Sequence, residues 1–174
     1  MRNDLLLHQY NQCLAHMNEL NPTAQNELVL FHGTNCDAVE LINERGFDRS
    51  MAGKHATALG LVSFCCLCVC SSYFFCSAGT YFARDAFYSC NPHFSPPNAD
   101  GFQFIYCARV AVGRYMRGAS NMRGPPRCVG NDEGQQLFAD SVVDNVAKPT
   151  MYCVFRDAQS FPEFVIKARR VRAV

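Results

Sequence analysis

The stretch Leu30-Phe31-His32-Gly33-Thr34 decides how this chain is organised, because it sets a histidine and a glycine at the end of a short apolar run. Residues 28–31 are all apolar, a pattern that predicts a buried strand. Backbone at a glycine can be approached closely by a ligand or by another segment, since no Cβ stands in the way. The stretch therefore predicts a strand that ends at a binding site.

A second motif, Gly79-Thr80-Tyr81-Phe82-Ala83, lies further along the chain and is followed by Tyr88-Ser89. A tyrosine ring can stack on a flat ligand, and histidine and serine side chains can bind hydroxyl and amide groups. Together the two motifs favour a flat, uncharged aromatic ligand. Taken singly they are less specific: a His-Gly pair is typical of a turn, Tyr81 is typical of a core, and Ser89 alone indicates nothing.

These residues resemble the catalytic domain of the poly(ADP-ribose) polymerase-like ADP-ribosyltransferases, specifically its mono-ADP-ribosylating branch. The resemblance extends from about residue 7 to residue 166, and a chance likeness would not preserve so many motifs in one order. Its further motifs are Gly46-Phe47-Asp48, Val112-Gly113-Arg114-Tyr115, Asp140-Ser141-Val142-Val143-Asp144-Asn145 and Pro162-Glu163-Phe164-Val165-Ile166.

The resemblance implies an enzyme that moves ADP-ribose from its substrate NAD to a protein side chain and releases nicotinamide. By resemblance, His32 binds a ribose hydroxyl, and Gly33 offers backbone hydrogen bonds to the nicotinamide amide. Ser89 binds the same amide through its hydroxyl, and Tyr81 stacks on the nicotinamide ring. The implied partners are NAD and protein acceptors, and no metal is implied.

The third catalytic position of the family falls on Met151. In chain-elongating members a glutamate there orients ribose hydroxyls and helps to activate the acceptor. A methionine side chain cannot take up a proton and accepts hydrogen bonds only weakly. The resemblance therefore predicts single transfers rather than poly(ADP-ribose), with the acceptor carboxylate acting as its own base. Met151 is equally interpreted as a core residue of a strand, and both interpretations can hold at once.

A catalytically silent module is the alternative function, one that keeps the ADP-ribosyltransferase fold and binds NAD-like ligands or protein partners. Three features favour it: Met151, an interruption at 61–77, and Pro92, which stands where family members usually have a second aromatic ring over the nicotinamide. His93 or Phe94 could replace that ring if the loop is shifted. The other site residues favour the enzyme.

The interruption at 61–77 is rich in Cys, Phe, Ser and Leu, and no charged residue occurs across 56–83. A membrane span of this length would separate His32 from Tyr81, and the cysteine spacing is wrong for zinc, so we reject both. The residue types have pyrimidine-rich codons, which favours a translated retained intron. Removing 61–77 restores Gly60-Ala78-Gly79-Thr80-Tyr81-Phe82, the family's spacing. We interpret the segment as an anomalous insertion in the loop over the donor site.

Size and charge indicate one domain over residues 1–174, with a formal net charge of +1. The basic residues are scattered apart from a cluster at 167–172, so a nucleic-acid partner is not indicated. The sequence shows no secretory signal, and its 11 cysteines are not regularly spaced. These two features predict reduced thiols and an intracellular location, in the nucleus or cytoplasm. Because the family normally has a strand before its first helix, we expect the domain to be incomplete at its N-terminus.

Periodicity predicts an α+β fold, with short strands after the early helices. The resemblance implies the same class, the ADP-ribosyltransferase fold of split antiparallel β-sheets with flanking helices. We expect helices at 3–21, 37–45 and 84–89, strands at 28–31, 102–112, 151–155 and 164–167, and mostly loop at 113–140.

Overall fold

The computed structural model describes residues 3–49, 79–119, 122–129 and 136–169 of the chain. The interruption at 61–77, and its interpretation as a retained intron, lie outside these residues. Within the described ranges, no helix has both the length and the apolar character that crossing a membrane requires.

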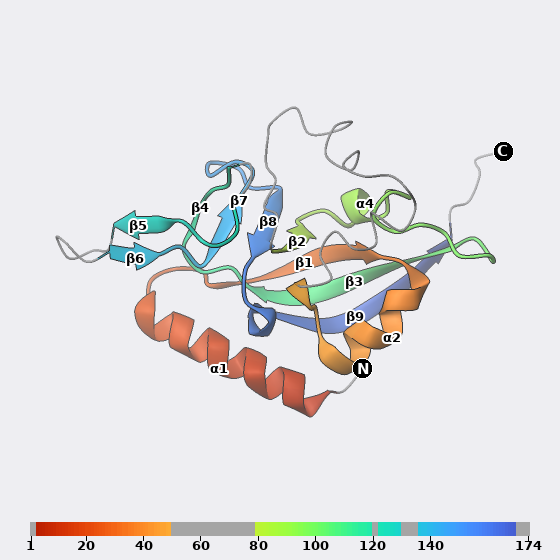
Figure 1. Ribbon diagram of the computed structural model, residues 1–174, viewed down its shortest axis with the longest axis horizontal. Helices are drawn as coiled ribbons and strands as arrows, with labels where there is room; N and C mark the ends of the chain where they lie inside the picture. The colour runs from red at the N-terminus through yellow and green to blue at the C-terminus, as the bar shows by residue number, and fades with distance from the viewer. Residues whose placement is uncertain (1–2, 50–78, 120–121, 130–135, 170–174) are drawn as a thin grey trace.

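Helices and strands alternate as far as α4, and the strands from β3 to β8 then follow one another (Figure 1). In order they are α1 (Asp4–Leu20), β1 (Glu27–Thr34), α2 (Cys36–Arg45), β2 (Thr80–Ala83), α4 (Ala86–Ser89), β3 (Phe102–Ala111), β4 (Tyr115–Arg117), β5 (Arg127–Val129), β6 (Gln136–Phe138), β7 (Ser141–Val143), β8 (Met151–Val154), η3 (Asp157–Gln159) and β9 (Ser160–Arg169). One sheet has the order β4-β7-β8-β2-β1-β3-β9, and β5 pairs with β6 separately.

The large sheet consists of two halves that barely join. In the first half, β1 pairs with β3 along its whole length, and β3 pairs with β9. The second half contains β2, β8, β7 and β4, and among the described strands of this half only the β4–β7 pair is parallel. Among the described residues, β1 and β2 are in register at a single pair, Phe31↔Ala83. The predicted α+β class with split, mainly antiparallel sheets is therefore confirmed, and we call the junction of β1 and β2 the seam.

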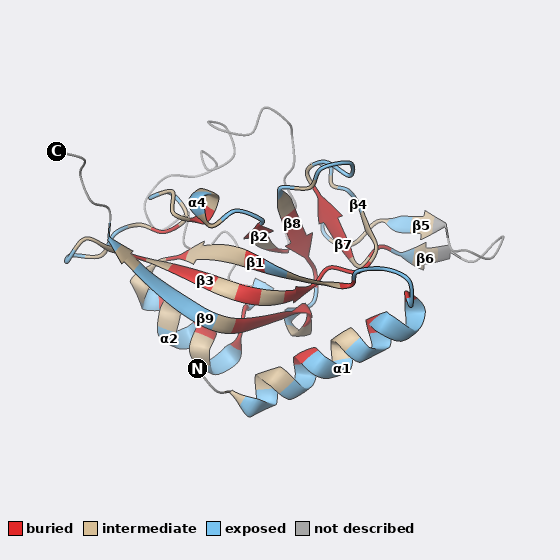
Figure 2. Cartoon of the chain, turned by 180° about the vertical axis from the view of Figure 1, so that it is seen from behind, coloured by how far each residue is buried: buried red, intermediate tan, exposed pale blue. Residues whose placement is uncertain are grey.

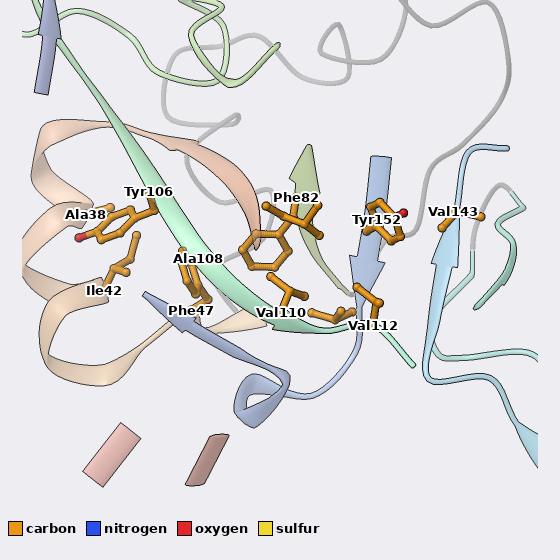
Figure 3. Packing of buried hydrophobic residues seen from close by; sticks show 12 residues of the cluster. Ala38, Ile42, Phe47, Phe82, Tyr106, Ala108, Val110, Val112, Val143 and Tyr152 are labelled. Atoms are coloured by element: carbon orange, nitrogen blue, oxygen red, sulfur yellow. The ribbon is translucent and has the colours of Figure 1, made fainter. Parts of the chain in front are cut away.

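One hydrophobic core underlies both halves. Figure 3 shows its side chains in a continuous row from Ala38 and Ile42 of α2 to Val143 of β7, with Phe47 and Phe82 near the middle. The Asn35 side chain caps the N-terminus of helix α2, where it accepts a hydrogen bond from the Ala38 N–H at 2.8 Å. The core therefore holds the two halves together beneath the seam.

Helix α1 is tied to the first half by a buried tyrosine. The Tyr10 hydroxyl donates to Glu27 Oε1 at 2.7 Å, and Arg109 Nε donates to the same oxygen at 2.6 Å. The Arg109 guanidinium also lies over the Tyr10 ring. Burial, together with the hydrogen bond to Glu27, raises the pKa of Tyr10. This group anchors α1 beneath β1 and β3.

The region 113–140 was predicted as mostly loop, and its described residues contain three short strands that the prediction missed. It contains β4, β5 and β6, and β7 follows at once as a wholly buried strand. Three-residue strands are too short to show a hydrophobic period, and β4 pairs with β7, which lies beyond β5 and β6 in the chain. Strand β9 is also longer than the predicted 164–167. Figure 2 shows the reason, because its first residues are buried and the rest are largely exposed, so no single pattern runs through it.

Candidate functional site

The predicted site residues gather at the seam, where β1 and β2 part. Successive residues of a strand face opposite sides of a sheet, so His32 and Gly33 face different sides. The His32 ring lies toward the core, against the rings of Phe47 and Phe82 at centroid distances of 5.2 and 5.6 Å. Gly33 faces the other side, where α4 contacts β1.

The His32 imidazole is held in one tautomer by the neighbouring strand. Its Nδ1 lies 2.7 Å from the carbonyl oxygen of Tyr81. A carbonyl only accepts, so Nδ1 carries the hydrogen and Nε2 is left as an acceptor. Burial lowers the pKa of His32, although the bond to Tyr81 opposes this effect. The ring is therefore neutral at pH 7 and can accept a hydroxyl hydrogen at Nε2.

Gly33 packs directly against α4 and the loop that follows it. A Cβ at this position would clash with the carbonyl oxygen of Ser89 and would lie 3.1 Å from the Cβ of Phe94. Ser89 is buried, and Phe94 stacks on Tyr88 with a centroid distance of 4.9 Å. The loop thus brings an aromatic residue beside Gly33 even though Pro92 occupies the position expected from the family.

Tyr81 and Met151 share one side of the second half. Strands β2 and β8 pair Tyr81 with Cys153 and Ala83 with Met151, so the side chains of Tyr81 and Met151 project to the same face. Both pack, partly buried, on the apolar cluster of Val142, Cys153 and Phe155. Met151 is thus a strand residue with core contacts, at the position where the family's elongating members carry a glutamate.

Asp144 fixes the start of β8, and sequence reasoning missed this role. Its Oδ1 accepts hydrogen bonds from the backbone N–H groups of Thr150, at 2.9 Å, and Met151, at 3.0 Å, and the Thr150 hydroxyl donates to Oδ2. Burial raises the pKa of Asp144, but the hydrogen bonds from Thr150, Met151 and Asn145 outweigh it, so the pKa lies below its ordinary value. An aspartate at the start of the Pro-containing loop 144–150 was the available signal.

Three contacts connect the five predicted residues in the structure. Gly33 contacts Ser89, Tyr81 packs in the same cluster as Met151, and His32 is hydrogen-bonded to Tyr81 across the seam. Within the residues described, no group of three or more His, Cys, Asp or Glu side chains is placed to hold a metal ion.

The chain has relatives of known name, although no family model matches it. Human protein mono-ADP-ribosyltransferase PARP14 is 35% identical over 170 residues, which cover 98% of this chain and 8% of that protein. Mouse protein mono-ADP-ribosyltransferase PARP10 is 33% identical over 170 residues, covering 96% of this chain and 15% of the relative. Human protein mono-ADP-ribosyltransferase PARP11 is 30% identical over 158 residues, covering 81% and 41% respectively.

The split sheet, the seam site and these similarities define one class of protein, the poly(ADP-ribose) polymerase-like ADP-ribosyltransferases. The chain belongs to this family, in its mono-ADP-ribosylating branch, as the sequence motifs predicted. It spans less than half the length of each of the three relatives named above.

Proposed function

We propose that this chain is an NAD-dependent protein mono-ADP-ribosyltransferase, which moves ADP-ribose from NAD to a protein side chain and releases nicotinamide. The seam is the observation that carries the proposal. It sets a neutral His32, with Nε2 left as an acceptor, beside Tyr81, and it sets Gly33 against Ser89.

Each of these residues suits one part of NAD. Nε2 of His32 accepts a hydrogen bond from a ribose hydroxyl. Gly33 allows the nicotinamide amide to reach the edge of β1, which beyond Phe31 has no register with β2 in the described residues. The Ser89 hydroxyl binds the same amide, and the Tyr81 ring stacks on the nicotinamide. We assign these roles as part of the proposal.

The reaction exchanges one bond at the ribose C1 atom. The bond to the nicotinamide nitrogen breaks, its electron pair stays on the ring, and nicotinamide leaves uncharged. The transition state has oxocarbenium character, as in glycoside hydrolysis, and a bond forms from C1 to an oxygen of the acceptor. The residues at the seam would contribute mainly by holding NAD in the reactive orientation.

Met151 supports single transfer over chain growth. Elongation uses a ribose hydroxyl as acceptor, and that hydroxyl must lose a proton as the bond forms. Methionine cannot take up this proton, whereas a carboxylate acceptor has none to lose at neutral pH. A carboxylate acceptor therefore fits the site without a catalytic base.

The silent-module alternative is less well supported. The relatives are named as transferases, and Phe94 lies beside Gly33, near where the family's second ring is expected. An intracellular setting, in the nucleus or cytoplasm, is part of the same proposal. It is supported by the free thiols of Cys13, Cys36, Cys90, Cys107 and Cys128 within the described ranges.

The test is nicotinamide release from NAD, measured by chromatography in the presence of a glutamate-rich acceptor protein. We expect Tyr81→Leu to slow release by about tenfold or more, because loss of ring stacking removes roughly 1–1.5 kcal/mol and misaligns the nicotinamide. The control is Phe138→Leu, which removes a largely exposed ring from β6 and should leave release within about twofold. Equal release by wild type and Tyr81→Leu, with both proteins folded, would contradict the proposal.

A further inference from the structure

A hollow of about 690 Å³ opens at one end of the second half of the sheet. Its lining residues come from the end of β2, the end of β4 and the loop between β7 and β8, three segments that Figure 1 shows at the same end of the second half. Its lining comprises Arg84, Arg117, Asp144, Asn145, Val146, Ala147, Lys148 and Thr150. Thr150 directly precedes Met151, and the Arg84 backbone N–H donates to the Thr150 carbonyl at 2.9 Å. The hollow therefore begins at the edge of the proposed transfer site.

Positive charge dominates the lining. Three cations, Arg84, Arg117 and Lys148, face one carboxylate, Asp144, which leaves an excess of two positive charges. Asp144 is engaged by hydrogen bonds from Thr150 and Met151. Arg84 forms a 3.2 Å ion pair with Asp85, and counting that carboxylate still leaves an excess of one.

Arg117 and Lys148 carry the charge that a ligand can use. Both side chains are exposed, and neither has a hydrogen bond or ion pair to any residue in the described part of the chain. Arg117 ends β4, in register with Val143 of β7, while Lys148 stands on the loop before β8. Arg117 and Lys148 line the hollow from two different elements. A ligand that pairs with both side chains therefore lies in the hollow.

We infer that this hollow docks an acidic, extended segment of the acceptor protein and so presents an aspartate or glutamate side chain beside Met151. The inference rests on the proposed function, and it names the acceptor class that function uses. Carboxylates on the segment pair with Arg117 and Lys148, while Val146, which is half exposed, offers an apolar contact. A single-stranded nucleic acid fits less well, because such ligands are held by aromatic rings that stack on the bases, and none of the described residues that line the hollow is aromatic.

The test measures binding of a fluorescein-labelled, glutamate-rich decapeptide to the full chain by fluorescence anisotropy, without NAD. The matched glutamine-rich peptide and a single-stranded RNA oligonucleotide are the competing probes. The variant is Arg117→Glu with Lys148→Glu. Because two attractions become two repulsions at a partly exposed site, we expect its affinity for the acidic peptide to fall by about tenfold or more. Added salt should weaken wild-type binding.

The control variant is Arg45→Glu with Lys167→Glu, which makes the same change in net charge on α2 and β9. Its affinity should stay within about twofold of wild type. Circular dichroism and thermal unfolding establish that both variants are folded. If the charge reversal disturbs β4, Arg117→Gln with Lys148→Gln replaces it as the test variant. Because that variant removes two attractions without adding repulsion, its affinity should be intermediate.

Four results would overturn the inference: equal loss in the control variant, equal binding of the glutamine-rich peptide, tighter binding of the RNA, or unchanged binding in the variant. The outcome is independent of turnover, because the peptide assay contains no NAD. Peptide binding that is lost in the variant, in a chain that releases no nicotinamide from NAD, would contradict the proposed function and keep the docking site. Nicotinamide release without selective peptide binding would support the proposed function and contradict the docking site.

Discussion

The two halves of the large sheet are held together in different ways. Strands β1, β3 and β9 have 8, 10 and 10 residues and pair along most of their length. Strands β2, β8, β7 and β4 have 4, 4, 3 and 3 residues, so they have few backbone pairs and depend on side-chain anchors. The difference teaches that the first half is a scaffold, whereas the second half, with Tyr81 and Met151, depends for its geometry on a few contacts.

One anchor bridges the two halves. The Gln159 side chain, fully buried, donates to the carbonyl of Ala111, at the end of β3, at 3.0 Å. It also donates to the carbonyl of Asp140, just before β7, at 2.9 Å. Buried polar groups that are fully paired in this way fix a unique arrangement. The Gln159 side chain, which lies in η3 and not in either half of the sheet, therefore helps to fix the relative position of the two halves.

The largest effect is expected at the seam. Gly33→Ala sets a methyl group against the backbone of Ser89, which cannot move without displacing α4. We expect the free energy of unfolding to fall by about 2–3 kcal/mol and transfer from NAD to be lost. Urea unfolding and labelled-NAD incorporation measure the two effects. The matched control is Gly124→Ala, whose added Cβ meets no atom within 4 Å and which should change stability by less than about 0.5 kcal/mol. Similar losses in Gly33→Ala and Gly124→Ala would show that the close contact between Gly33 and Ser89 is not required for stability or transfer.

A smaller effect is expected at the anchor of the short half. Asp144→Ala leaves the backbone N–H groups of Thr150 and Met151 without their acceptor, which should cost about 1–3 kcal/mol in the free energy of unfolding. We expect transfer to slow as well, because Met151 and its neighbours lose their fixed position. Urea unfolding and nicotinamide release test both parts.

The same variant makes a pH prediction. The pKa of Asp144 is lower in the folded chain than its ordinary 3.8, so its stabilisation is complete above that value and is lost as pH falls through the folded pKa. The stability difference between wild type and Asp144→Ala should therefore shrink below pH 3.8. A difference that stays constant to lower pH would show that the carboxylate charge has no part in the anchor.

The long half should tolerate the loss of one anchor. Tyr10→Phe removes the hydrogen bond to Glu27, while Arg109 still pairs with that carboxylate. We expect a loss of about 1–1.5 kcal/mol in unfolding free energy and transfer within about twofold of wild type, measured by urea unfolding and nicotinamide release. A large loss of transfer would mean that the first half is more than a scaffold.

The smallest effect is expected from mild acid. Burial holds the pKa of His32 below its ordinary 6.5, so the imidazole stays neutral as the pH falls from 8 to 6.5. Transfer should therefore keep more than half of its rate over that range and should fall below half only at lower pH, when Nε2 takes up a proton and can no longer accept a hydrogen bond. A pH–rate profile that already falls by half above pH 6.5 would contradict the lowered pKa of His32.

The sequence predicted the long half better than the short one. Residues 28–31 and 102–112 form apolar runs long enough to indicate β1 and β3, and α2 covers the expected helix at 37–45. Strands β4 and β7 have three residues each and pair with each other across the intervening β5 and β6. No local pattern marks them, because their formation depends on tertiary pairing.

The candidate site shows the same division. The motifs containing His32, Gly33, Tyr81 and Ser89 predicted which residues to examine, and their placement at the seam is consistent with that prediction. Sequence did not predict the role of Asp144 or the hollow beside it. Both depend on how the loop at 144–150 folds back onto β8, which no spacing along the chain encodes.

The most direct measurement of the central claim is the mass of the products after the chain has been incubated with NAD. We predict single ADP-ribose additions on acidic side chains, with no chains of ADP-ribose. The additions should be absent in His32→Ala, checked by circular dichroism to be folded, and present in His16→Ala, which removes an exposed imidazole from α1. Additions that persist unchanged in folded His32→Ala, or polymeric products from the wild-type chain, would contradict the account.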